Sequence, residues 1–256
     1  MDDIKNEVKM KNIVLFVLVA MALLTAGCSQ ANVQPDTPVA NPAVDTGSSA
    51  PETTLPATDA VISNSPESGL SDAESAGLAF MREEEKLAYD VYMALYAQWG
   101  TPVFQNIASS ELTHTQSVKG LLDRYGLPDP SAGLVEGQFN NPELQALYDQ
   151  LVLQGGQSLE DALRVGAAIE EIDILDLQER MDAADEPDIL QVYGNLLTGS
   201  ENHLRAFVSQ LESRTSTAYQ PQYLSVEVYE QIMAGQPGYR GGGGNGGQGQ
   251  GGGNSN

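Results

Sequence analysis

The chain has 256 residues, of which 35 are acidic and 12 are lysine or arginine, so its formal net charge is −23. A surface this acidic repels phosphate groups, which argues against nucleic acid or an anionic membrane surface as a partner. The single cysteine, Cys28, excludes an internal disulfide, a cysteine-based zinc site and an iron–sulfur cluster made by this chain alone.

The first 27 residues have the pattern of an export signal. Three lysines precede an apolar run at residues 13–24, which is too short to cross ~30 Å of hydrocarbon comfortably as a helix. Small residues stand directly before Cys28, as in a lipoprotein signal, with Thr25 in place of the usual leucine. We therefore expect residues 1–27 to be cleaved and Cys28 to carry a lipid that holds the protein on a membrane in the cell envelope, outside the cytoplasm. The alternatives are a simple cleaved signal and a buried, inert cysteine.

Two further segments have compositions that do not support a folded core. Between residues 30 and 70 there are six prolines and no aromatic residue, lysine or arginine, which predicts a disordered tether over residues 28–70. Residues 236–256 are almost all glycine, asparagine and glutamine, which predicts a flexible tail. The remaining residues, 71–235, are enough for one domain of about 160 residues with a real core.

Capping residues and helix breakers divide this domain into six helices. Ser71 and Glu74 form a capping box, and Thr101 is a cap followed by Pro102 in the first turn. The expected helices span about residues 71–99, 101–125, 141–156, 158–183, 187–213 and 225–234. The link between the second and third long helices is too long for a hairpin turn. An all-α four-helix bundle with a long crossover and a short C-terminal helix is therefore predicted.

The second long helix carries the most informative pair of side chains. Glu111 and His114 are three residues apart, so a helix places them one turn apart on the same face. A helical wheel at ~100° per residue puts both on an apolar stripe with Val118 and Leu122. Glu-x-x-His on an inward face is how four-helix bundles present an oxygen and a nitrogen ligand to a pair of metal ions.

The other long helices also place ionisable side chains on apolar stripes. Glu170 shares its face with Leu163 and Leu177, whereas its neighbour Glu171 leans toward solvent. His203 faces inward on the fourth long helix.

The first long helix is less decisive, because Glu84 and Glu85 both have apolar neighbours, while Glu83 is expected to be solvated. An ionised carboxylate alone on an apolar face must be paired, protonated or bound to a metal. Few lysines or arginines share these faces, and the two histidines of the chain both face inward on separate helices. Metal binding explains this constellation, although each histidine by itself can be a satisfied core residue.

These patterns resemble the ferritin-like superfamily, which includes ferritins and rubrerythrins. Glu85 is followed by alanine three places on and by Tyr92 seven places on, as in the first helix of that superfamily, which favours Glu85 over Glu84. Glu111 and His114 match its second-helix Glu-x-x-His, and the glutamate at position 170 matches its third-helix ligand.

A closer resemblance, over about residues 71–234, is to the uncharacterised ferritin-like family named domain of unknown function 2202. The segments that carry this likeness are residues 82–88, 122–128, 169–174, 202–207 and 221–225. The likeness is specific for the fold, and it implies less about activity because the family has no settled function.

One position departs from the superfamily pattern. The fourth helix usually repeats Glu-x-x-His, but Ser200 stands three places before His203. Asp173, three residues after Glu170, lies on the adjoining face and is a candidate to compensate. The resemblance therefore implies the metal ligands Glu85, Glu111, His114, Glu170 and His203, with Asp173 as a further candidate.

The resemblance also implies two iron ions, or manganese, and oxidoreductase chemistry with dioxygen or peroxide. The expected reactions are oxidation of ferrous iron and reduction of peroxide, with Glu111 and Glu170 as bridging carboxylates. Tyr92 is either core packing or a redox-active neighbour. Peroxidase turnover needs an external electron donor, because the chain has no second cysteine for a rubredoxin-type centre. The competing interpretation is a non-catalytic surface module, with a structural or degraded metal site, that binds a partner protein. A homodimer is compatible with either.

Overall fold

The computed structural model describes residues 69–216 and 218–236, so the predicted signal, Cys28 and nearly all of the predicted tether and tail lie outside the described residues. The described residues form six α-helices and no strand. These helices are α2 (Asp72–Trp99), α3 (Pro102–Arg124), α4 (Pro142–Gly155), α5 (Leu159–Ala183), α6 (Pro187–Thr215) and α7 (Val226–Met233). Within this part of the chain, none of the helices is both long and apolar enough to cross a membrane.

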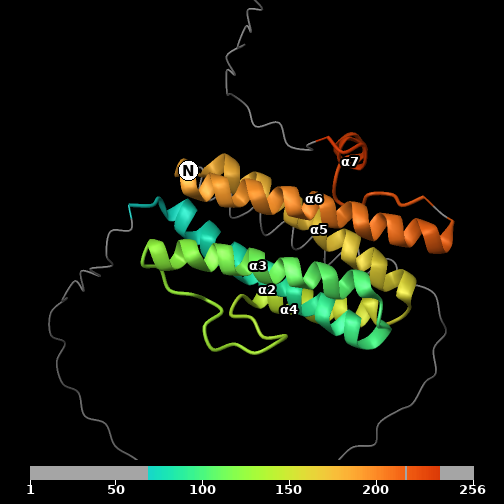
Figure 1. The fold of residues 1–256 in the computed structure, drawn as a ribbon. Coiled ribbons are helices and arrows are strands. Elements are labelled where there is room, and N and C mark those ends of the chain that lie inside the picture. The colour runs from blue at the N-terminus through green and yellow to red at the C-terminus, as the bar shows by residue number, and fades with distance from the viewer. Residues whose placement is uncertain (1–68, 217, 237–256) are drawn as a thin grey trace, which may run out of the picture. The chain divides into compact units, whose positions relative to one another are not determined.

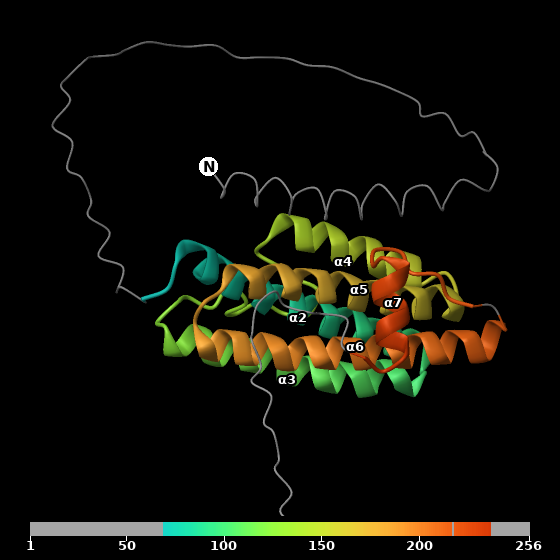
Figure 2. The same cartoon turned by 90° about the horizontal axis from the view of Figure 1, so that it is seen from above.

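The four long helices pack as two pairs. Helix α2 lies along α3, α5 lies along α6, and the pairs meet through contacts of α2 with α5 and of α3 with α6 (Figure 1). The crossover between the pairs contains α4, which packs on α2 and α5, and α7 lies across α6 (Figure 2). The predicted all-α bundle, with its crossover and short C-terminal helix, is confirmed.

Side chains cap the starts of α2, α4, α5 and α7, whereas α3 and α6 begin without a side-chain capping hydrogen bond. The Ser71 side chain accepts a hydrogen bond from the Glu74 backbone N–H, and the Glu74 carboxylate accepts one from the Ser71 N–H, so the capping box is confirmed. Ser158 caps α5 through its side chain. Thr101 occupies the N-cap position of α3, as predicted, but its side chain makes no capping hydrogen bond. Pro102, whose ring fixes a helical φ and needs no N–H partner, marks this helix start instead.

A buried aromatic cluster fills the bundle interior beside its polar centre. Phe207 packs against Tyr92 and Phe104, with ring centroids 5.1 and 5.6 Å apart. Gly166 on α5 makes room for the Phe207 ring, because a Cβ atom there would lie 2.5 Å from it. The cluster thus joins α2, α3 and α6 and fixes the helices that carry the polar side chains described next.

Candidate metal centre

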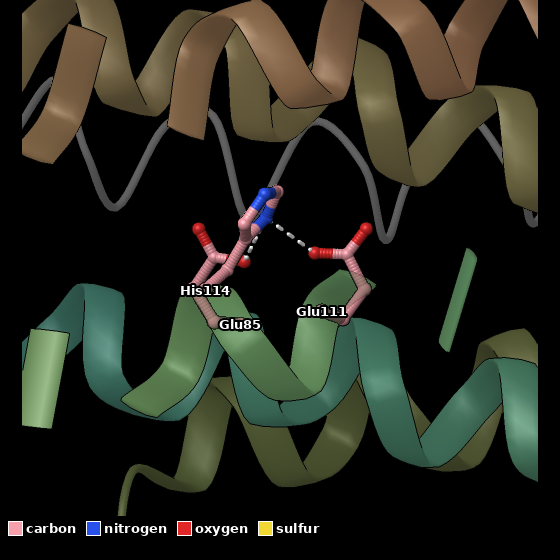
Figure 3. A group of neighbouring side chains, drawn as sticks. All are labelled: Glu85, Glu111 and His114. Atoms are coloured by element: carbon pink, nitrogen blue, oxygen red, sulfur yellow. Dashed lines mark hydrogen bonds and ion pairs between the residues drawn. The ribbon is translucent and has the colours of Figure 1, made fainter. Parts of the chain in front are cut away.

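Side chains of α2 and α3 form one group of metal-ligand type. Glu111 Oε2 lies 2.8 Å from His114 Nδ1, and Glu85 Oε2 lies 3.3 Å from the same nitrogen (Figure 3). Both carboxylates are buried and the imidazole is 11% exposed. The α2 helix therefore contributes Glu85, not Glu84, to this group.

A second group lies beside the first and shares Glu111 with it. Glu111 Oε1 lies 2.7 Å from His203 Nδ1, and Glu170 Oε2 lies 3.6 Å from that nitrogen. The two imidazole rings are stacked with centroids 5.6 Å apart. Each group has the spacing to hold a metal ion. Glu111, which turns one oxygen to each group, therefore has the position of a bridging ligand.

Glu170 differs from the sequence expectation that it also bridges. It belongs to the second group alone, and its other oxygen, Oε1, accepts a hydrogen bond of 2.6 Å from the Tyr92 hydroxyl. Burial raises the pKa of Tyr92 and the negative charge of Glu170 raises it further, so the phenol keeps its proton and remains a donor. Tyr92 thus orients Glu170 from the aromatic cluster.

Asp173 lies next to the two groups and belongs to neither. Ser200 Oγ donates its hydrogen bond to Asp173 Oδ2 and also lies 3.0 Å from the carbonyl oxygen of Leu196, an alternative acceptor for the same hydrogen. Burial raises the pKa of Glu85, and the nearby charge of Asp173 raises it further, which places this aspartate beside the first group. Ser200 of α6 thus contacts a carboxylate of α5 that lies outside both ligand groups.

The electrostatics of the two groups depend on protons. Burial lowers the pKa of His114, but hydrogen bonds to Glu111 and Glu85 outweigh it and raise the value to about 11. Burial likewise lowers the pKa of His203, while Glu170 and Glu111 raise it to about 10. For Glu111, burial raises the pKa but the two imidazoles lower it to about 2. Without metal, both rings are therefore protonated at neutral pH, and both positive charges face Glu111.

The donor set passes a direct test of its fit to a metal. Glu111 Oε1 and His203 Nδ1 face each other at 2.7 Å without hydrogen-bond geometry, and neither atom has another hydrogen-bond partner among the described residues. Glu85 Oε1 is also buried without such a partner there. A buried oxygen without a partner, such as Glu85 Oε1, costs about 1–3 kcal/mol, whereas Glu111 Oε1 and His203 Nδ1 need either a proton or a cation between them. A cation would satisfy these atoms, and carboxylate with imidazole suits iron, manganese or zinc.

Gly199 on α6 is a residue of this site that the sequence interpretation missed. A Cβ atom at this position would lie 2.6 Å from His114 Cε1 and 2.7 Å from Nε2. The glycine therefore leaves the space that the imidazole occupies. The available signal was a glycine inside a predicted helix. Glycine lowers helix stability, so its presence there indicates a packing requirement.

Glu83 and Glu171, which were expected to lean toward solvent, are buried, so both expectations are wrong. Glu83 accepts hydrogen bonds from the backbone N–H groups of Asn140 and Asn141, at the start of α4. Glu171 accepts hydrogen bonds from the Tyr219 hydroxyl and from the backbone N–H groups of residues 222–224. These two carboxylates tie the crossover and the C-terminal segment to the bundle.

The fold and the site define an all-α bundle protein with two adjoining buried groups of carboxylate and imidazole ligands. The family described as an uncharacterized protein domain, DUF2202, matches residues 74–236, and the chain belongs to this family. The predicted membership is therefore confirmed.

The chain is similar to the uncharacterized protein MJ0754 of Methanocaldococcus jannaschii. The two are 49% identical over 173 residues, which cover 68% of this chain and 93% of the relative. The crystal structure of the hypothetical protein MJ0754 from Methanococcus jannaschii matches 72% of this chain and 99% of its own, with 45% identity and a TM-score of 0.64.

Proposed function

We propose that this protein is a ferritin-like oxidoreductase that holds two iron ions, or two manganese ions, between its helix pairs. The observation that carries the proposal is the sharing of Glu111 by two groups, each with its own second carboxylate and its own imidazole. The proposed ligands are Glu85, Glu111, His114, Glu170 and His203. Asp173, held by Ser200, is the additional carboxylate of the site.

Iron bound by these side chains would supply one-electron redox chemistry toward dioxygen or peroxide. The proposed reaction is oxidation of ferrous iron, or reduction of peroxide with electrons from an external donor. The residues of the chain set the conditions for this chemistry. Tyr92 fixes Glu170, Gly199 leaves room for His114, and the surrounding apolar core keeps bulk water from the site.

Metal loading in this proposal is an exchange of protons for cations. In the metal-free protein His114 and His203 hold protons that face Glu111 at their Nδ1 atoms. A ligating imidazole must be neutral, so each ring releases its proton when its nitrogen binds metal. The protons on the two rings therefore stabilise the metal-free bundle and leave the site when metal binds.

We further propose that the protein acts outside the cytoplasm and is anchored by a lipid on Cys28. The support is the sequence pattern of residues 1–28, which lie outside the described residues. Labelling of producing cells with radioactive palmitate tests this: the full chain should incorporate label and the Cys28→Ala variant should not. Equal labelling of both would contradict the anchor.

Ser200 favours a second candidate function, a non-catalytic module that binds metal structurally or binds a partner protein. Serine supplies no carboxylate from α6, so the two groups have three carboxylates between them, Glu85, Glu111 and Glu170. Open coordination positions separate the two candidates, because a catalytic centre needs them and a structural one does not.

Elemental analysis of the full chain, produced without a histidine tag, tests the proposed function. About two irons or manganese ions per chain, as the two ligand groups require, and a ferric absorption band after ferrous iron and air are added, would support the oxidoreductase. A single tightly held zinc ion and no iron oxidation would support the structural module instead.

A further inference from the structure

Helices α3 and α6 form one side of the bundle, opposite the side on α2 and α5 that α4 covers (Figure 2). Over residues 102–118 of α3 and 189–211 of α6, every exposed side chain is uncharged. We call these exposed side chains the neutral face. They include Ser109, Thr113 and Gln116 of α3, and Asn195, Thr198 and Asn202 of α6.

The ionisable side chains of these two stretches lie beneath the neutral face or at its border. The buried ones are Glu111, His114, Glu201 and His203. Arg205 is half-buried, and it donates hydrogen bonds to the carbonyl of Ile232 in α7 and to the side chain of Asn202. Its guanidinium is therefore held at the border with α7. The neutral face itself presents uncharged polar side chains and Leu112, which is 42% exposed.

The two uncharged stretches lie side by side. The hydroxyl of Tyr125, just past the end of α3, donates a hydrogen bond to Asp188 at the start of α6, so the two helices run antiparallel. Midway along them, Gly199 of α6 lies against the ring of His114 on α3. The uncharged parts of α3 and α6 therefore adjoin over most of their length and form one continuous surface.

The size of the neutral face can be compared with that of known interfaces. At about 1.5 Å per residue, residues 102–118 span about 25 Å. Two adjoining helices, each about 10 Å wide, make the face roughly 20 Å across, so its area is about 500 Å². Two such faces would bury about 1,000 Å² in total, which is close to the smallest area of a specific interface. The neutral face is therefore large enough for a weak specific pair.

The charge of the chain decides which partner fits this face. A basic partner would be attracted to the acidic remainder of a chain whose net charge is −23. An acidic partner is repelled there and can approach closely only at the neutral face. Depletion of charged residues is also what distinguishes the centre of protein–protein interfaces. A second copy of this chain is an acidic partner that carries the same face, and a two-fold axis pairs such a face with itself.

We propose that the neutral face binds a second copy of this chain and forms a symmetric dimer. This inference goes beyond the proposed function and does not depend on bound metal. The side chains of His114 and His203 are each 11% exposed and lie where α3 and α6 meet. The dimer would therefore place the metal centres of the two copies on either side of one shared interface.

Sedimentation velocity of the full chain tests the dimer. The chain carries Cys28→Ala, so that neither a lipid nor a disulfide can join two copies. A dimer should form, and its Kd should fall several-fold when the salt concentration rises from about 0.1 M to about 1 M. The reason is that the Debye length shortens from about 10 Å to about 3 Å and screens the repulsion between the acidic surfaces. A monomer under all conditions, or a dimer that salt dissociates, would overturn the proposal.

A matched pair of charge substitutions tests the location. Thr113→Lys places a charge on the neutral face, whereas Ala146→Lys places it at an exposed position of α4. Both changes make the chain less acidic, so they weaken the general repulsion between copies equally. Thr113→Lys should nevertheless raise the Kd at least about tenfold, because it buries unpaired like charges in the interface. Ala146→Lys should leave the Kd unchanged or lower it, and equal Kd values for the two variants would refute this location.

Chemical cross-linking checks the location independently. Because Cys28 is the single cysteine of the chain, Thr113→Cys or Ala146→Cys in the Cys28→Ala chain provides one defined thiol. A bifunctional maleimide that spans about 25 Å, the length of the neutral face, should join Thr113→Cys chains into covalent dimers and leave Ala146→Cys chains mostly monomeric. Equal yields of covalent dimer from the two variants would exclude the neutral face as the interface.

The dimer and the proposed function can fail separately. Glu111→Ala removes the shared ligand of the proposed centre, and the folded variant should keep the Kd of the dimer while losing its metal. A dimer that binds no metal and oxidises no iron would uphold the interface and refute the proposed function. A monomer that binds two metal ions and oxidises iron would refute the interface alone.

Discussion

Two kinds of buried glutamate occur in this bundle, and they differ in what their oxygens contact. The anchoring carboxylates, Glu74, Glu83 and Glu171, accept hydrogen bonds from backbone N–H groups of loops and helix starts. The site carboxylates Glu85 and Glu111 face imidazoles, and each keeps an oxygen with no hydrogen-bond partner among the described residues. The anchoring carboxylates have all their hydrogen-bond donors within the protein, whereas the site carboxylates need protons on the imidazoles or a metal ion to balance their charge.

The comparison teaches that burial does not by itself identify a metal ligand. Glu170 and Glu171 are adjacent in α5 and are 2% and 0% exposed. A backbone N–H is a permanent donor, so Glu171 has a fixed structural role. An imidazole can lose its proton and bind metal, so the carboxylates that face His114 and His203 have a role that can change.

The largest effect should come from removing the shared ligand. Glu111→Ala deletes the carboxylate common to both groups, so metal affinity should fall at least about 100-fold at both positions. Elemental analysis and metal titration measure this, and circular dichroism checks that the helical fold persists. Full metal content in a folded Glu111→Ala protein would refute the proposed centre.

The reciprocal change should affect stability and spare the metal. Glu171→Ala leaves the N–H groups of residues 222–224 and the Tyr219 hydroxyl without their acceptor, which should lower the free energy of unfolding by about 3 kcal/mol. Urea denaturation measures the loss, and the metal content per folded chain should remain that of the unmodified protein. A loss of metal with unchanged stability would reverse the distinction between the two kinds of carboxylate.

The stability of the metal-free protein should fall as the pH rises above neutrality. The pKa values of His114 and His203 are raised from about 6.5 to about 11 and about 10 in the folded chain. Protonation of the two rings therefore contributes fully to the free energy of unfolding below about pH 6.5, and this contribution is lost as the pH approaches about 10–11. Burial raises the pKa of Asp173 to about 8. Its protonated form therefore contributes to stability below about pH 4, and this contribution is also lost as the pH rises to about 8.

Urea denaturation at pH 6, 8 and 10 measures this dependence. The same series with bound metal is its control, because neutral metal-bound imidazoles have no such proton to lose. Identical pH profiles with and without metal would contradict the assignment of these histidines.

The smallest of these effects should come from Gly199→Ala. The added Cβ would displace the His114 ring and should lower metal affinity about tenfold, as changes beside metal ligands commonly do. Gly194→Ala is the matched control, because a Cβ atom at this other α6 glycine meets no atom within 4 Å. Metal titration should separate the two variants, and equal affinities would show that the ring tolerates the methyl group.

The sequence predicts the helices well because their ends are decided by nearby residues. Ser71 and Glu74 contact each other across a single turn, and Pro187 starts α6 by its own ring geometry. The ligand candidates Glu111 and His114 are also local, because helical periodicity alone puts them on one face.

The errors concern contacts between segments far apart in the chain. Glu83 is buried by residues 140–141 and Glu171 by residues 219–224, none of which belongs to the four long helices. A helical wheel gives the direction of a side chain but not which loop will cover it. The same limit hides Gly199, whose role depends on a ring carried by another helix.

The contact between Gly199 and His114 has a consequence for comparing relatives. Any family member with a side chain at the position of Gly199 must move the imidazole or lack it, so these two positions should change together between sequences. A side chain larger than glycine at this α6 position can therefore serve as a marker, readable without a structure, for relatives in which the imidazole of the α2–α3 half is displaced or absent.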